Sequence, residues 1–406
     1  MDRRVVVTGV GMISPLGIGV QASWSALCAG KSGVAPITRF DATPYDTHIA
    51  AEVKGYHPEE FMGRKEARRL ELFISYAVAA TRMAIDDSGL KITAENAGRI
   101  GVITGCGLGG LRFMEDTIYD LKQNGPRRVS PFFIPMMIGN MAPGMISILF
   151  GAKGPNLSLA TACAAGAHAV GDSFKLIQQG RVDAMITGGT EAVIAPSCIA
   201  GFNAMKALST RNAEPERASR PFERDRDGFV PGEGAGILIL EELDHARQRG
   251  ARIYAEVAGY GLTGDGYHMT SPPPDGNGAA RCMQMAIEDA GIRPEQVDYI
   301  NAHGTSTPTG DSIEVDCLRA IFGRALPGIP VSANKSQIGH TLGGAAAIEA
   351  SFAIEGMRRG IILPTVNHIP DPEMDGIDAT HAIRTGSTRP PPTPSPAFWR
   401  WDGRPR

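Results

Sequence analysis

Apolar positions follow two spacings along the chain, and each spacing predicts a different kind of element. Short continuous apolar runs predict strands at residues 4–9, 100–104, 184–189, 251–261, 299–302 and 329–332. Helical spacing predicts helices at residues 24–30, 64–88, 277–291, 312–322 and 345–357, with Gly89 as the C-cap of the second. Because strands and helices alternate, we expect mainly parallel sheets that are covered on both faces.

The two halves of the chain repeat one order of features. Residues 154–158 precede Cys163, a helix of small residues and a strand near residue 181. Residues 328–332 precede His340, a run of small residues, a helix and a strand near residue 361. The repeat predicts a duplicated α/β unit with one reactive group from each copy near a pseudo-twofold centre. We therefore expect a first unit at residues 1–250, which holds the cysteine, and a second at 251–378, which holds the histidines.

Cys163 follows the apolar run 157–162 and precedes the small residues 164–170. A buried strand that turns directly into a helix places this cysteine at the helix N-terminus, where the macrodipole and free N–H groups favour the reactive thiolate. A backbone donor beside the sulfur would also hold an oxyanion. This stretch by itself fits a small core residue equally well, because free cysteines are often buried.

Two histidines follow strands of the predicted second unit. His303 lies in the Gly- and Thr-rich segment 301–311, and His340 ends the segment 334–340. Catalytic groups of α/β sheets usually lie just beyond strand ends. One histidine in such a place is more often structural, but two of them opposite a cysteine at a third strand end indicate a site for nucleophilic catalysis.

Composition and charge narrow the class of protein. The 406 residues are 43% hydrophobic and 20% charged with a net charge of −3, so nothing in them favours binding to nucleic acid or membranes. We find no apolar window long enough to span a membrane and no signal peptide. The six cysteines form no Cys-x-x-Cys pair, which argues against zinc and favours a reducing compartment. We expect a cytoplasmic protein without a bound metal.

Three long blocks resemble the signature sequences of β-ketoacyl-acyl carrier protein synthases. They read Ala-Thr-Ala-Cys at 160–163, Asn-Ala-His-Gly-Thr-Ser-Thr-Pro-Thr-Gly-Asp at 301–311, and Asn-Lys-Ser-Gln-Ile-Gly-His at 334–340. Stretches at 107–110, 130–135, 207–212, 226–230 and 267–272 resemble the type II, long-chain bacterial enzymes. The resemblance implies an α/β, thiolase-like fold in which two duplicated βαβαβαββ halves form a five-layered αβαβα sandwich.

The resemblance also implies a reaction and its catalytic residues. Cys163 would take an acyl chain from a thioester, and a malonyl thioester would lose carbon dioxide to give an enolate that attacks this acyl group. His303 and His340 would donate N–H groups to the enolate oxygen, and Lys335 would keep both imidazoles neutral. The product would be a 3-oxoacyl chain longer by a two-carbon unit, as in fatty acid elongation.

Other residues are given supporting roles by the same resemblance. Leu108 would lie at the gate of the acyl pocket, with a core residue as the alternative. Thr270, Thr305 and Thr307 would line the phosphopantetheine tunnel, with exposure to water as the alternative. Buried support, rather than direct chemistry, is implied for three acids, Asp311, Glu314 and Glu349.

The implied partner is acyl carrier protein, which carries the substrates on phosphopantetheine, so the enzyme would need no cofactor of its own. A basic set would dock this acidic partner: Arg64, Lys65, Arg68, Arg69, Arg127, Arg128 and Lys206. A solvated basic face is the alternative. The apolar segment 131–150 is expected in the core, around a ligand pocket, or at a homodimer interface.

The resemblance stops after about residue 378. Family members continue with a Gly-rich loop that carries a gating Phe and an oxyanion N–H, whereas residues 384–406 hold five Arg, six Pro and one acid. We expect residues 379–406 to be a disordered tail or the product of a reading-frame shift, and a native divergent tail is the alternative. Three rival functions stay open: a polyketide ketosynthase, a non-catalytic partner subunit and a thiolase.

Overall fold

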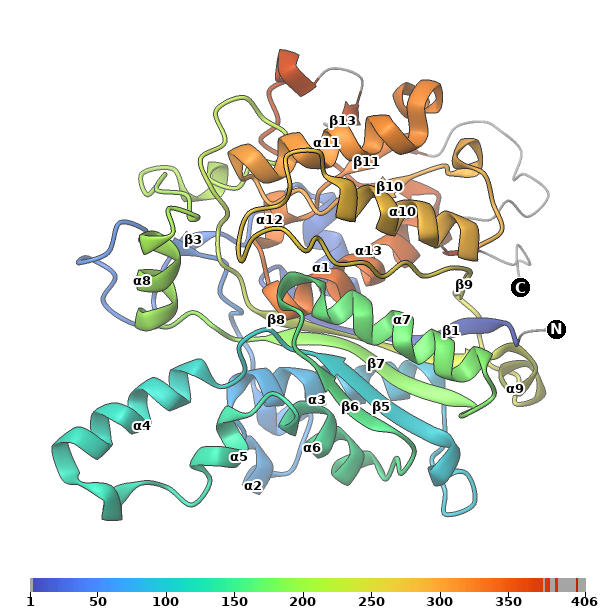
Figure 1. Ribbon diagram of the computed structural model, residues 1–406. Helices are drawn as coiled ribbons and strands as arrows, with labels where there is room; N and C mark the ends of the chain where they lie inside the picture. The colour runs from blue at the N-terminus through green and yellow to red at the C-terminus, as the bar shows by residue number, and fades with distance from the viewer. Residues whose placement is uncertain (1–2, 375–376, 380–383, 386–398, 401–406) are drawn as a thin grey trace.

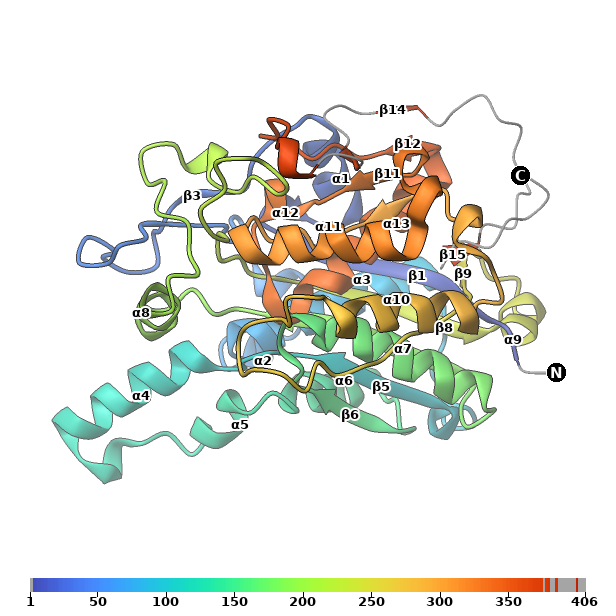
Figure 2. The ribbon, with the colours of Figure 1, turned by 45° about the horizontal axis from the view of Figure 1, so that its top comes forward.

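The computed structural model describes residues 3–374, 377–379, 384–385 and 399–400 (Figures 1 and 2). Its largest sheet has the strand order β15-β9-β1-β8-β7-β5-β6, and β2 pairs with β1 beside this path. The strands are β1 (Val5–Ser14), β2 (Gly17–Ile18), β5 (Ile100–Gly105), β6 (Asn156–Leu159), β7 (Ala184–Glu191), β8 (Gly234–Glu242), β9 (Ala255–Val257) and β15 (Trp399–Arg400).

Strand directions in this sheet differ from the prediction of a mainly parallel arrangement. β5 is parallel to β6 and β7, but β1 is antiparallel to β8 and β9, and β7 is antiparallel to β8. The prediction is wrong here because it assumes one crossover helix between successive strands, whereas the segment 192–233 between β7 and β8 is not such a crossover and β8 pairs antiparallel with β7.

A second sheet is parallel as predicted. It joins β10 (Ile300–Asn301), β11 (Pro330–Ser332) and β13 (Asp378–Ala379). Two-stranded sheets join β12 (Ile361–Ile362) to β14 (Arg384–Thr385) and β3 (Ala35–Pro36) to β4 (Ile49–Ala50).

Helices complete five alternating layers (Figure 1). α3 (Leu72–Ser88) and α6 (Met141–Phe150) cover the outer face of the large sheet, and α7 (Ala165–Gln178) and α13 (Ala345–Arg359) lie between the sheets. α10 (Asn277–Asp289) and α11 (Pro308–Phe322) cover the second sheet. Alternation along β8 explains the layering, because Ile237 and Ile239 pack with the α3 side whereas Leu238 and Leu240 pack with the α7 side.

The remaining helices and 3₁₀ turns connect these layers or lie at their edges. They are α1 (Val20–Cys28), η1 (Pro58–Glu60), α2 (Arg64–Ala67), η2 (Ala97–Arg99), α4 (Leu111–Asn124), η3 (Pro126–Arg128), α5 (Phe133–Met137), η4 (Ala162–Ala164), α8 (Pro196–Ala204), η5 (Pro215–Arg217), α9 (Leu243–Gln248), η6 (Pro294–Gln296), η7 (Gly323–Gly328), α12 (Lys335–Ile338), η8 (Leu342–Gly344) and η9 (Pro372–Met374).

Two predicted elements differ from the structure in an informative way. The helix predicted at 64–88 is broken into α2 and α3, because Glu71 has an extended backbone and caps α3 by accepting the Phe73 N–H. Its predicted C-cap is confirmed, since Gly89 is left-handed at φ 64°. The strand predicted at 251–261 shrinks to β9, because residues 259–261 run against the backbone of α10, where a Cβ on Gly261 would lie 2.0 Å from the Cys282 carbonyl oxygen.

The predicted repeat is visible as two similar turns. Ala162 (φ 51°) begins η4 before α7, and Leu342 (φ 44°) begins η8 before α13. The start of α7 packs against η8, because a Cβ on Gly166 would lie 2.7 Å from the Gly343 carbonyl oxygen, and it approaches α13, whose Ala347 N would lie 3.5 Å from the same Cβ. The unit boundary near residue 250 stays a prediction, and β9, which follows it, pairs with β1.

The tail predicted at 379–406 lies mostly outside the described residues. Within it, Arg384–Thr385 and Trp399–Arg400 form the short strands β14 and β15. Among the helices that the structure describes, none combines the length and apolar character needed to cross a membrane.

Candidate active site

Cys163 lies in η4, at the turn that leads from β6 into α7, as the sequence predicted. Its own backbone N–H and the Lys335 ammonium both favour the thiolate. Burial outweighs them and raises the pKa of the thiol above its ordinary value. The backbone N–H therefore favours the thiolate as expected, but burial decides the net direction of the pKa of Cys163.

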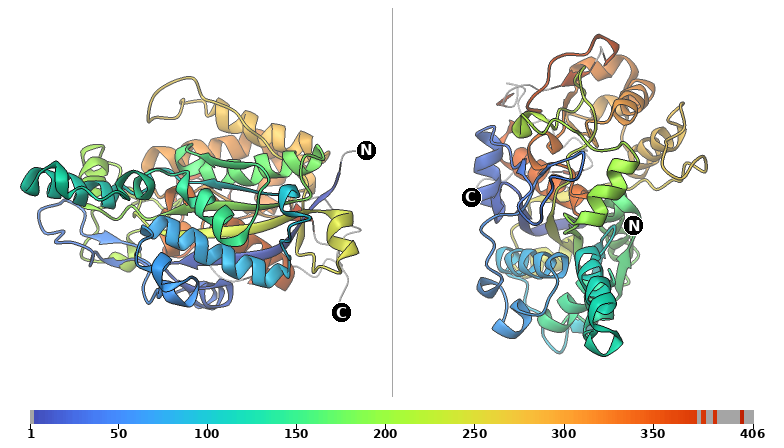
Figure 3. Two further views of the ribbon diagram at one scale, coloured as in Figure 1. Left: turned by 90° about the horizontal axis from the view of Figure 1, so that it is seen from below. Right: turned by 90° about the vertical axis from the view of Figure 1, so that its left-hand side faces the viewer.

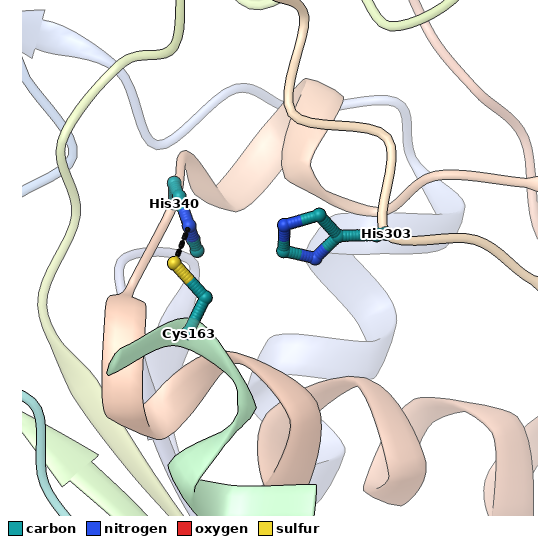
Figure 4. Close-up of side chains that lie close together, drawn as sticks. All are labelled: Cys163, His303 and His340. Carbon is teal, nitrogen blue, oxygen red and sulfur yellow. Dashed lines mark hydrogen bonds between the residues drawn. The ribbon is translucent and has the colours of Figure 1, made fainter. Parts of the chain in front are cut away.

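His340 is the direct partner of the cysteine (Figure 4). Its Nε2 lies 2.9 Å from the Cys163 Sγ, and its Nδ1 accepts the Leu342 N–H at 3.3 Å. A ring nitrogen that accepts carries no proton, so this contact assigns the proton of the neutral ring to Nε2, which points at the sulfur. His340 therefore has the neutral imidazole that the resemblance implied, and its second ring nitrogen accepts a hydrogen bond.

His303 faces the same space from the loop after β10 (Figure 4). Its ring lies 5.4 Å from that of His340 at an angle of 85°, and one ligand atom from each of Cys163, His303 and His340 lies within 4.8 Å of the others. In the described part of the chain this is the one group of such side chains close enough to hold a metal ion; the absence of a metal stays a prediction.

Both imidazoles are held in the neutral form. His340 is buried, and His303 is crowded by protein atoms although part of its side chain is exposed. Burial, followed by the nearby Lys335 charge, lowers the pKa of both histidines below the ordinary value. Neutral imidazoles can each donate one N–H to an oxygen that becomes negative between them.

Lys335 is itself fixed by an acid. Its Nζ lies 2.7 Å from the Glu349 Oε1, and both residues are buried. Because the pair is neutral overall, the ammonium is tolerated in the interior while it still opposes a second positive charge on the imidazoles.

The other two predicted supporting acids hold backbone rather than reacting atoms. The Glu314 carboxylate accepts the N–H groups of His303 and Gly304, each at 2.7 Å. Asp311 accepts the N–H groups of Phe222 at 2.8 Å and Ser306 at 3.1 Å. Burial raises the pKa of Asp311 to about 7. These acids fix the loop that carries His303.

The predicted tunnel residues are only partly brought together. The hydroxyls of Thr305 and Thr307 lie 3.0 Å apart beside His303. Thr270 lies on the exposed stretch before α10, where its N–H donates to His268. Leu108 is 48% exposed on the loop after β5.

Three neighbours of the site were missed by sequence reasoning. Phe229 packs edge-on against His340, with ring centroids 5.4 Å apart. Cys198 is buried in an apolar cluster that Cys163 contacts, together with Val193, Ala195 and Leu342. Glu191 ends β7 and is fully buried, at 0% exposure. A glutamate that closes an apolar strand was the available signal for it.

The seven predicted docking residues are all exposed. Arg64 and Lys65 belong to α2, Arg127 and Arg128 belong to η3, and Lys206 follows α8. Figure 3 shows that α8 and α4, which leads into η3, lie on one side of the molecule. The Arg69 guanidinium stacks on Phe132 at 5.0 Å, which joins this basic set to the apolar segment 131–150.

An apolar surface surrounds the edge of the large sheet. β6 is the last strand on that side, and its Leu157 is 50% exposed. Ile148 on α6 is 70% exposed, and Ile134 on α5 is 53% exposed. An exposed strand edge flanked by apolar side chains is a typical association surface.

Comparison with known proteins gives the same family for both halves of the chain. Residues 2–246 match the family described as β-ketoacyl synthase, N-terminal domain, and residues 254–368 match the corresponding C-terminal domain. The 3-oxoacyl-[acyl-carrier-protein] synthase 2 of Vibrio cholerae is 50% identical over 377 residues, covering 93% of this chain and 91% of that protein. The protein of the same name from Staphylococcus aureus (strain COL) is 50% identical over 375 residues, with coverage of 92% and 90%.

Solved structures are similar over the same length. A β-ketoacyl synthase from Burkholderia phymatum superposes with a TM-score of 0.87 at 35% identity, covering 94% of this chain and 93% of that chain. A type II polyketide synthase acyl-carrier protein in complex with its ketosynthase gives a TM-score of 0.87 at 34% identity, with coverage of 95% and 94%.

Proposed function

This chain belongs to the β-ketoacyl synthase family and has its thiolase-like fold, and from that premise we propose how its residues perform the reaction. The reaction is the decarboxylative condensation of malonyl-acyl carrier protein with an enzyme-bound acyl chain, which elongates fatty acids as 3-oxoacyl-acyl carrier protein. The observation that carries the assignment of residues is the Cys163 thiol facing the Nε2 of His340, with His303 across the same space.

Acylation comes first. The Cys163 thiolate attacks the carbonyl carbon of the incoming thioester, the new C–S bond forms, and the old C–S bond breaks. The proton lost by Cys163 is balanced by the proton that the departing carrier thiolate takes up. The Cys163 N–H, in the turn η4 that leads into α7, is a donor beside the sulfur, where the carbonyl oxygen becomes negative.

Decarboxylation follows in the same space. The malonyl C–C bond to the carboxylate breaks, carbon dioxide leaves, and the electron pair stays on the remaining two carbons and their thioester oxygen as an enolate. The N–H groups of His303 and His340 stabilise this oxygen. The enolate carbon then attacks the acyl carbonyl on Cys163, a C–C bond forms, and the sulfur leaves and regains a proton.

The substrate arm reaches these residues from the surface. Thr305 and Thr307, with Thr270 on the loop before α10, line the route of phosphopantetheine, and Leu108 lies where the acyl chain turns inward. Their small hydroxyls suit an arm of alternating amides and methylenes. Because the carrier brings the reactive thioester, the enzyme needs neither a cofactor nor a metal of its own, and it works in the cytoplasm.

Acyl carrier protein docks on the basic set around α2, η3 and α8. Seven exposed cationic side chains attract an acidic partner by long-range electrostatics, which raises the rate of association. The complex of a polyketide acyl-carrier protein with its ketosynthase, a similar structure, supports such a partner.

Two copies of the chain form a homodimer through β6. The exposed Leu157, Ile148 and Ile134 support this arrangement, because pairing of two β6 edges would extend the sheet and cover them.

A polyketide ketosynthase is the second candidate. Similar solved structures include the ishigamide ketosynthase/chain length factor, at a TM-score of 0.88 and 35% identity. The two functions share their chemistry and differ in the acyl chain that is extended. Comparing the turnover of saturated acyl-carrier thioesters with that of polyketo-acyl-carrier thioesters therefore separates them.

Mass spectrometry of the intact protein tests the proposal. Incubation with an acyl-carrier thioester is expected to add one acyl group at Cys163, and malonyl-carrier is then expected to remove it as product. Cys163→Ser should not turn over, and Cys163→Gln should keep or increase malonyl decarboxylation. Normal acylation of Cys163→Ala would contradict the assignment. Uptake of the acyl group without condensation would contradict the complete reaction. It would instead indicate a catalytically impaired chain or a non-catalytic partner subunit.

A further inference from the structure

Glu191 is a buried acid that the proposed mechanism does not use. Its Oε2 accepts the Gly107 N–H at 2.6 Å and the Gly343 N–H at 3.1 Å. Its Oε1 accepts the Leu108 N–H at 3.2 Å and the Cys106 thiol at 3.3 Å. One carboxylate therefore holds the loop after β5 and the turn η8, which are far apart in the sequence.

Both segments border the nucleophile. Gly107 lies against the turn that carries Cys163, since a Cβ on it would be 3.8 Å from the Ala162 Cα. Gly343 follows His340 by three residues and lies behind the Gly107 N–H, which a Cβ on Gly343 would approach to 2.7 Å. The charge of Glu191 also reaches the Cys163 thiol, whose pKa it helps to raise.

The Leu108 side chain depends on this loop for its position. It is 48% exposed, so packing alone does not fix a large apolar side chain there. Its backbone N–H and that of Gly107 both donate hydrogen bonds to the Glu191 carboxylate. The loop can move only if these hydrogen bonds break, which is costly because the carboxylate is buried. Leu111, three residues further on, packs on the apolar cluster that Cys163 contacts, so this loop adjoins the apolar surroundings of the nucleophile.

We propose that Glu191 is a positioning residue that latches the Leu108 loop, so that its hydrogen bonds to Gly107 and Leu108 set how readily a long acyl chain, relative to a short one, reaches Cys163. The inference rests on the proposed function. A short acyl group fits beside the sulfur without moving Leu108, whereas a long one must pass it and displace the loop.

Two variants weaken the latch in different ways. Glu191→Gln keeps the shape but replaces one acceptor by an amide N–H that faces a backbone donor. Gly107→Ala keeps the carboxylate but places a Cβ 2.7 Å from the Oε2, which pushes the loop away from it. Glu52→Gln is the matched control, because Glu52 is another buried carboxylate that accepts backbone N–H groups, those of Thr38 and Arg39, outside the site.

The experiment measures kcat and KM for acylation of Cys163 by butyryl- and myristoyl-carrier thioesters in the full chain. Both latch variants are expected to raise the myristoyl-to-butyryl ratio of kcat/KM by about fivefold, the effect of one ordinary hydrogen bond. Glu52→Gln should leave the ratio unchanged. Folding of each variant is checked by its melting temperature. If Glu191→Gln does not fold, the ratio measured for Gly107→Ala tests the inference by itself.

An unchanged or lower ratio, with both rates falling together, would mean that Glu191 only supports the fold and would overturn the inference. A wild-type chain that takes up neither acyl group would overturn the proposed function and this inference with it. A wild-type chain that is acylated while both variants keep its ratio would overturn the latch alone.

Discussion

The Nε2 of His340 lies 2.9 Å from the Sγ of Cys163, although the two residues are 177 positions apart in the chain. His303 reaches the same space but is not hydrogen-bonded to the sulfur in the structure. The two histidines therefore differ in one respect that kinetics can resolve: His340 touches the acylated atom, and His303 faces only the space where the enolate forms.

The first prediction separates the two histidines. His303→Ala should reduce malonyl decarboxylation by about a hundredfold to a thousandfold, the usual cost of one oxyanion donor, while Cys163 acylation falls less than tenfold. His340→Ala should reduce both half-reactions, because its N–H also supports the thiolate. Acylation is followed by mass spectrometry and decarboxylation by release of carbon dioxide. Equal effects of the two substitutions on acylation would contradict the distinction.

The second prediction concerns Lys335 and pH. Because the pKa of both histidines is lowered, decarboxylation should persist as the pH falls through the ordinary histidine value near 6.5. Lys335→Met removes a charge that lowers these pKa values and that of Cys163. As the pH is lowered, the variant should therefore lose decarboxylation at a higher pH than wild type does. Alkylation of Cys163 by iodoacetamide should also require a higher pH in the variant than in wild type.

Lys335→Met also leaves Glu349 buried without its partner, which by itself destabilises the fold. The double variant Lys335→Met with Glu349→Gln removes both charges and serves as the control. An alkylation profile in Lys335→Met identical to that of wild type would contradict the role of Lys335.

The third prediction concerns docking. Lys65→Glu combined with Arg68→Glu should raise the KM for acyl-carrier substrate about tenfold and weaken its salt dependence. Turnover of a small pantetheine thioester should barely change, because this substrate needs the tunnel but not the basic set. Lys91→Glu, the reversal of one exposed lysine outside the set, is the control and is compared with Lys65→Glu alone. Equal losses on both substrates would indicate damage to the fold instead.

Arg69 is a separate case within the same basic set. Its guanidinium stacks on Phe132, so its reversal would change packing as well as charge. Arg69→Gln should therefore lower the melting temperature, whereas Lys65→Gln should not.

The fourth prediction concerns assembly. Leu157→Arg places a charge on the β6 edge and should convert a dimer into a monomer at micromolar concentration in analytical ultracentrifugation. Ile369→Arg is the matched control, since Ile369 is also exposed, at 45%, but lies on the second half of the chain. A wild-type monomer at this concentration would refute the dimer.

Local pattern and motif spacing predicted much of this molecule. The three-residue site could be predicted because each member follows a strand and carries a rare reactive side chain. The break at residues 68–71 could not, because the apolar spacing continues through it and only the extended backbone of Glu71 interrupts the helix.

Long-range contacts explain what the sequence could not show. The net pKa of Cys163 depends on burial by segments remote in sequence, which local reasoning about the helix N-terminus leaves out. The role of Glu191 depends on donors from residues 106–108 and 343, and no periodicity along one strand indicates that they converge. Antiparallel pairing of β7 with β8 likewise depends on the path of the excursion between them.

The twin left-handed turns at Ala162 and Leu342 bear on why one chain has a single reaction centre. The turn residue is followed by Cys163 in one copy and by Gly343 in the other, so the second place for a nucleophile is structurally present but bare. A side chain at 343 would collide with the backbone of Cys106 and Gly107, at 2.8 Å and 2.7 Å from its Cβ. The two turns are therefore alike in backbone and unlike in chemistry: one presents the thiol of Cys163, and the other carries a glycine, which lets it pack against the backbone of the loop after β5.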